Sequence, residues 1–107
     1  MIDEKANIII SEICDELKSI YPDFRGIYLF GSHARGEAND DSDIDLAILF
    51  DREIDWRFKD SVRDVIIEKE IKYSLIIDSH FYNTQDFIEP ATPLRENIKL
   101  QGIFHGK

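Results

Sequence analysis

The chain of 107 residues is acidic, with 22 aspartates and glutamates against 13 lysines and arginines and a formal net charge of −9. A field of this sign repels polyanions and therefore disfavours general nucleic-acid binding. The single cysteine excludes an internal disulfide and fits a reducing cytoplasm, and no apolar stretch approaches the ~20 residues that span a membrane. We therefore expect one small cytoplasmic domain over residues 1–107, because this length suits one hydrophobic core.

The first half of the chain predicts one long helix followed by two strands. Apolar residues at helical spacing predict a helix over residues 2–20, which a following proline ends. A short apolar strand is expected over 27–30, a brief helix over 32–38 and a turn over 39–42. Residues 44–50 are almost wholly apolar, which predicts a strand that is buried on both faces.

The second half predicts a helix, a third strand and two further short helices. One apolar stripe with charges opposite predicts a helix over 54–70, and a strand is expected over 73–77. Residues 83–86 predict a short capped helix, and residues 94–101 a final one that follows a proline. The resulting order predicts an α/β fold with a small mixed sheet of about three strands and flanking helices. The helix between the second and third strands favours parallel pairing there.

Residues 28–50 contain the pattern that points to chemistry. Gly31 lets backbone approach a ligand closely, and Ser32 stands where a helix would begin. The free N–H groups at such a helix start favour phosphate. Asp43 and Asp45 lie two residues apart on an expected strand, so their carboxylates share a face and repel each other unless a cation lies between them. A phosphate site facing a divalent-metal site is typical of phosphoryl or nucleotidyl transfer, with Mg²⁺ as the expected ion.

Simpler explanations exist for the same acidic run. A calcium loop fails because the central glycine and closing glutamate of an EF-hand are missing. A solvated turn suits Asp40 and Asp41, but it suits Asp43 and Asp45 poorly because they open the most apolar strand of the chain. The metal-binding interpretation is therefore the better one for the second pair.

Gly31-Ser32, ten intervening residues and Asp43-Ile44-Asp45 resemble the signature of the nucleotidyltransferase superfamily that includes DNA polymerase β. The surrounding sequence is similar to that of its minimal, MNT-type members. The resemblance implies a nucleotidyltransferase-like fold in which Asp43 and Asp45 hold Mg²⁺ in a two-metal site. It also implies that Gly31 and Ser32 hold the phosphates of a nucleoside triphosphate, expected to be ATP. Arg35 would either steady those phosphates or pair with a neighbouring acid.

The resemblance implies a third carboxylate from the next strand, and here the sequence departs from the pattern. In the expected register this third-acid position is Ser74. Asp78 would face the same way but lie about 13 Å further along, at ~3.3 Å per residue, unless the register slips or the pairing is antiparallel. A serine hydroxyl supplies neither the charge of a carboxylate nor a general base, which weakens the case for catalysis.

The favoured function is transfer of a nucleoside monophosphate from a nucleoside triphosphate to a hydroxyl. The resemblance implies that the acceptor is carried by a partner, because minimal MNT proteins are often antitoxins of helical HEPN-type toxins. One alternative is a non-catalytic antitoxin or binding module with a remnant active site. Another is a small-molecule nucleotidyltransferase that works as a homodimer, with its acceptor pocket across the interface.

Overall fold

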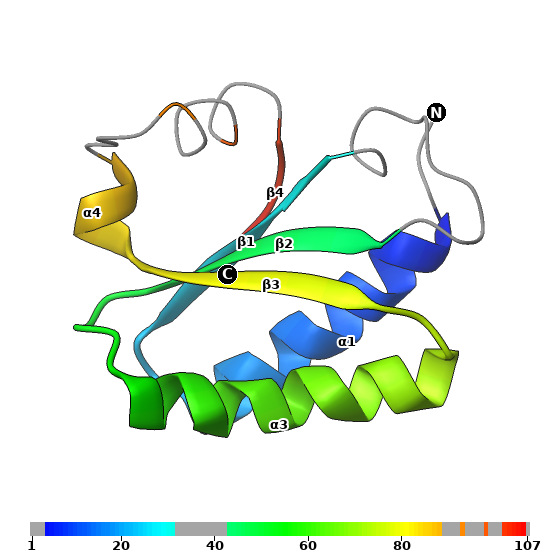
Figure 1. Ribbon diagram of the computed structural model, residues 1–107. Helices are drawn as coiled ribbons and strands as arrows, with labels where there is room; N and C mark the ends of the chain where they lie inside the picture. The colour runs from blue at the N-terminus through cyan, green and yellow to red at the C-terminus, as the bar shows by residue number, and fades with distance from the viewer. Residues whose placement is uncertain (1–3, 32–42, 89–92, 94–97, 99–101, 107) are drawn as a thin grey trace.

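The computed structural model describes residues 4–31, 43–88, 93, 98 and 102–106. The elements in chain order are α1 (Glu4–Ile20), β1 (Phe24–Phe30), β2 (Ile44–Phe50), α3 (Trp56–Tyr73), β3 (Ile77–Asn83), α4 (Thr84–Ile88) and β4 (Ile103–Gly106). The described strands form one mixed sheet in the order β3-β2-β1-β4 (Figure 1). β1 pairs antiparallel with both β2 and β4, whereas β3 runs parallel to β2.

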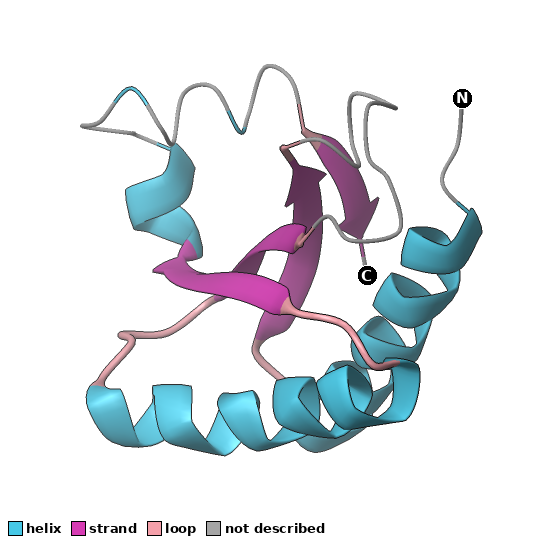
Figure 2. Ribbon diagram, turned by 45° about the vertical axis from the view of Figure 1, so that its right-hand side comes forward, coloured by secondary structure: helices cyan, strands magenta, loops and turns pink. Residues whose placement is uncertain are grey.

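The two long helices cover the same face of this sheet (Figures 1 and 2). Their apolar residues pack against alternate residues of β2, such as Leu46 and Ile48, to form the main core. The intervening residues, such as Ala47 and Leu49, point to the other face and pack with Phe87 of α4 in a smaller cluster. Successive strand side chains alternate between faces, so one strand supplies both clusters. Among the described residues, no helix is long and apolar enough to cross a membrane.

Both ends of α3 are capped. At its start, the Asp55 carboxylate accepts a hydrogen bond from the Phe58 N–H at 2.8 Å. At its end, Ser74 adopts a left-handed conformation (φ 53°) and donates its N–H to the Glu70 carbonyl. The Glu70 carboxylate then accepts the N–H of Ile77, the first residue of β3, at 2.9 Å. The end of the helix is therefore tied directly to the start of the strand.

The structure confirms much of the predicted order and corrects its third strand. The strand over 44–50 and its parallel pairing with the next strand are confirmed. The predicted strand over 73–77 is wrong, because α3 continues to Tyr73 and β3 covers Ile77–Asn83. The sheet has four described strands instead of about three, since Ile103–Gly106 adds an edge strand that the sequence analysis missed.

Three other predicted segments lie wholly or partly outside the described residues. The brief helix expected over 32–38 and the turn over 39–42 lie outside the described residues. Of the final helix expected over 94–101, the structure describes Ile98, which is helical and buried. The short helix expected at 83–86 is confirmed as α4.

A buried lysine joins the two long helices. Lys69 of α3 is 4% exposed and donates to Glu16 and Glu12 of α1. Glu12 also accepts from Lys72 at 2.8 Å and from the Tyr73 hydroxyl. A buried ammonium is costly unless it is paired, so this arrangement fixes how the C-terminal part of α3 lies on α1.

This network predicts an acid-sensitive contribution to stability. The hydrogen bonds from Lys72 and Tyr73 lower the pKa of Glu12 from 4.5 to about 2. Because the pKa is lower in the folded chain, the stabilisation is fully present above pH 4.5 and is lost as the pH falls through about 2. Denaturant titrations should show the wild type losing its advantage over Glu12→Gln across this window. A difference that does not change with pH would contradict the assignment.

Candidate active site

The face of the sheet opposite the two long helices carries two paired carboxylates. Asp45 of β2 lies directly across from Asp78 of β3 in the parallel register. Both alternate with residues of the helix-covered core, so their side chains share the other face. Asp78 is more than half exposed, and Asp45 is partly buried.

The electrostatics of Asp45 show how close these carboxylates are. Burial raises the pKa of Asp45, and the negative charges of Asp78 and Asp43 raise it further. Carboxylates this close repel one another unless a proton or a cation lies between them. Asp43, Asp45 and Asp78 therefore form an acidic site at the start of β2 and β3.

Gly31 directly follows β1 and borders this acidic site. It has a positive φ of 74°, a conformation that favours glycine. A Cβ atom at this position would lie 2.2 Å from Oδ2 of Asp45, which is far inside van der Waals contact. The backbone of Gly31 thus touches the Asp45 carboxylate because no side chain separates them.

An imidazole flanks the acidic site. Nε2 of His80 lies 3.4 Å from Oδ2 of Asp78, and the His80 ring lies 5.8 Å from that of Phe30, centre to centre. Phe30 is the partner of Asp45 in the β1–β2 register, so these residues belong to neighbouring positions of one face. The signal for His80 in the sequence is its position, because it lies two residues after Asp78 and shares its strand parity.

The acidic site suits a divalent cation without being a complete cage. Among the described residues, no three acidic, histidine or cysteine side chains converge closely enough to ligate one ion by themselves. Mg²⁺ typically takes one or two carboxylates and completes its shell with water and substrate phosphates. The mutually repelling carboxylates at Asp45 and Asp78 fit that requirement.

The predicted site residues fall into three groups. Asp43 and Asp45 interact electrostatically, as their spacing predicted, and Gly31 lies against Asp45. Ser32 and Arg35 lie outside the described residues. The expected register was wrong by four residues, because Ser74 ends α3 while Asp78 lies opposite Asp45.

Comparison with known proteins gives matches along nearly the whole chain. A family model described as the nucleotidyltransferase domain matches residues 10–105. A candidate protein adenylyltransferase of Methanocaldococcus jannaschii is 38% identical over 106 residues, which cover 98% of this chain and 89% of that protein. The candidate protein adenylyltransferase MntA of Haemophilus influenzae is 27% identical over 73 residues, which cover 68% of this chain and 63% of that protein.

Solved structures show the same fold. A toxin–antitoxin crystal structure with AMP-PNP contains a chain that is 23% identical, with a TM-score of 0.64 over 91% of this chain and 73% of that one. A complex of tri-AMPylated Shewanella oneidensis HEPN toxin with MNT antitoxin gives 20% identity and a TM-score of 0.60, covering 95% of this chain and 73% of that one. The arrangement of helices and strands is therefore shared with these proteins.

Proposed function

This chain belongs to the nucleotidyltransferase domain family, and on that premise we propose that it transfers AMP from ATP to a hydroxyl on a partner protein. Pyrophosphate would be the other product of the reaction. The observation that supports this proposal best is the pairing of Asp45 with Asp78, beside Asp43 and against Gly31.

Asp43, Asp45 and Asp78 are the proposed metal-holding and catalytic carboxylates. When bound, Mg²⁺ would neutralise phosphate charge and polarise the α-phosphate for in-line attack. The Asp45 carboxylate would bind the metal from the partly buried centre of the site, and the Asp78 carboxylate from its exposed side. An exposed carboxylate can also accept the proton of an approaching hydroxyl, which a serine at this position could not do.

Gly31 is proposed to bring backbone close to the triphosphate. The absence of a side chain leaves its α-carbon against Asp45, so phosphates and carboxylates can lie next to each other. Ser32 and Arg35 follow in the sequence, and we propose them as further phosphate-binding residues on the pattern of the motif alone. ATP is the proposed donor because the relatives in sequence are named for adenylyl transfer.

A HEPN-type protein is the proposed acceptor. One of the solved structures that contain this fold is a complex of a tri-AMPylated HEPN toxin with an MNT antitoxin. The alternative of a non-catalytic remnant was based on Ser74 as the third-acid position and on the net charge of −9. The pairing of Asp78 with Asp45 places a carboxylate opposite Asp45 and so supports the enzymatic proposal.

Intact-mass measurement tests the proposal directly. The chain is incubated with ATP, MgCl₂ and a HEPN-domain protein from the same organism, and we expect that protein to gain the mass of whole adenylyl groups. A matched incubation with excess EDTA should give no gain. A HEPN-domain protein of unchanged mass after full incubation, with the chain folded, would refute the enzymatic proposal.

A further inference from the structure

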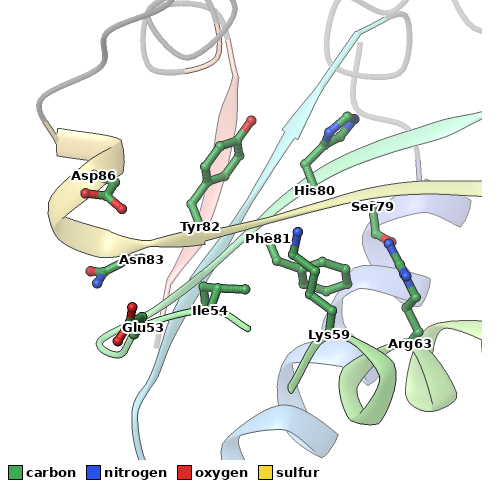
Figure 3. A pocket seen from close by; sticks show the side chains of 10 residues that line it. All are labelled: Glu53, Ile54, Lys59, Arg63, Ser79, His80, Phe81, Tyr82, Asn83 and Asp86. Carbon is green, nitrogen blue, oxygen red and sulfur yellow. The ribbon is translucent and has the colours of Figure 1, made fainter. Parts of the chain in front are cut away.

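A cleft of about 580 Å³ runs along the outer edge of β3 (Figure 3). In the described sheet β3 is an edge strand, because β2 is its neighbour on one side only. The residues that line the cleft come from the start of α3, the loop before it, β3 itself and α4. His80 and Tyr82 rise on one side of the strand, and Lys59 and Arg63 reach toward it from α3 (Figure 3).

Two cations, Lys59 and Arg63, line one end of this cleft, and two acids, Glu53 and Asp86, line the other end (Figure 3). Lys59 and Arg63 are one helical turn apart, so they lie on the same side of α3. The Arg63 guanidinium lies 5.8 Å from the centre of the Phe81 ring, and its nearest carboxylate, at 3.8 Å, belongs to its exposed helix neighbour Asp60. Within the described part of the chain, no carboxylate lies within 4 Å of the Lys59 ammonium.

The edge is continuous with the acidic site on the same strand. Asp78 and His80 alternate with Ser79 and Phe81, so β3 presents the site on one face and packs on α3 with the other. A strand added beside β3 would lie about 4.8 Å away and would follow the same alternation of faces. Every second side chain of that strand would therefore stand on the face that carries Asp78.

We propose that an extended segment of the acceptor protein adds to the sheet beside β3 and so delivers its hydroxyl to the acidic site. An acidic residue of the segment would lie against Lys59 and Arg63, because these cations are the charges that the cleft offers from α3. The hydroxyl-bearing side chain would be opposite Asp78 or His80, on their face of the sheet. Strand addition supplies affinity through main-chain hydrogen bonds, and the side chains select the segment. This inference rests on the proposed function, whose acceptor it positions.

The first test measures binding without nucleotide, so that it does not depend on catalysis. The HEPN-domain protein of the mass measurement above is titrated into the wild type and into Lys59→Glu with Arg63→Glu. We expect the double reversal to weaken binding at least ~10-fold, because it places like charges against the acidic residue of the segment. The matched control is Lys5→Glu with Lys18→Glu, two exposed positions on α1, which changes the net charge equally. It should bind within about twofold of the wild type, since these positions lie outside the cleft.

The second test locates the contact by amide hydrogen exchange in the wild-type complex. Binding should slow exchange in β3, and β4 serves as the control because it is the other edge of the described sheet. Equal affinity of the two double variants, protection at β4 in place of β3, or no binding by the wild type would overturn the inference. Slowed exchange at β3 without AMP transfer would uphold the inference and refute the proposed function. AMP transfer without slowed exchange at β3 would refute the inference and uphold the proposed function.

Discussion

Asp78→Asn is expected to lower AMP transfer on the order of 100-fold or more while the chain stays folded. The substitution removes the charge that faces Asp45 across the β2–β3 register, together with the proton acceptor nearest the exposed side of the site. It also relieves repulsion in the metal-free chain, so the free energy of unfolding without Mg²⁺ should stay equal or rise slightly. Rates of adenylyl transfer at saturating ATP, with thermal unfolding in EDTA, measure both effects.

Ser74 provides the matched control for the third acid. Ser74→Gly should leave transfer unchanged, because this residue ends α3 and does not pair with β2. It should also stabilise the chain by up to about 1 kcal/mol, since glycine adopts the left-handed conformation without strain. If Ser74→Gly lost transfer and Asp78→Asn kept it, the assignment of the third acid would be wrong.

Gly31→Ala is the second substitution with a large expected effect. Alanine is strained at a φ of 74°, and its Cβ would lie 2.2 Å from Oδ2 of Asp45, so the carboxylate must move. We expect a loss of about 1–2 kcal/mol in stability from the backbone alone. Transfer should fall by about 100-fold, because a shift of ~1 Å in a reacting group costs that much. Denaturant unfolding and transfer rates on the same preparation report the two losses.

Gly31→Asn separates the two causes. Asparagine tolerates the left-handed conformation better than alanine, but its Cβ meets the same Asp45 oxygen. It should therefore recover part of the stability and none of the transfer. Recovery of transfer by asparagine would mean that backbone conformation, and not the contact with Asp45, explains the need for glycine.

The sequence predicted the centre of the sheet well because its signals there are strong and local. Residues 44–50 are a continuous apolar run with acids at the start, so both the strand and the face of Asp45 followed from periodicity. Motif spacing also predicted that the Gly31 turn lies near the acids, whereas its direct contact with the Asp45 carboxylate is visible only in the structure.

The sequence misplaced the third acid because the boundary between α3 and β3 depends on tertiary contacts. Tyr73-Ser74-Leu75 reads as strand by composition, yet the Tyr73 hydroxyl donates to Glu12 on α1 and extends the helix. β4 was missed for a similar reason. Its four residues are a weak pattern by themselves, and pairing with β1 is what makes them a strand.

The number of residues in the short connection between α3 and β3 determines which face of the sheet carries Asp78. Ser74 leaves the helix, the Glu70 carboxylate accepts the N–H of Ile77, and the N–H of Ile44 donates to the Ile76 carbonyl at 3.0 Å. Inserting or deleting one residue here would turn Asp78 toward the helix-covered face, because strand parity changes with every residue. A relative can therefore contain every acid of the motif and still lack the paired carboxylates if this connection differs in length. The number of residues between the end of α3 and the third acid therefore indicates, better than the motif alone, which family members assemble the site.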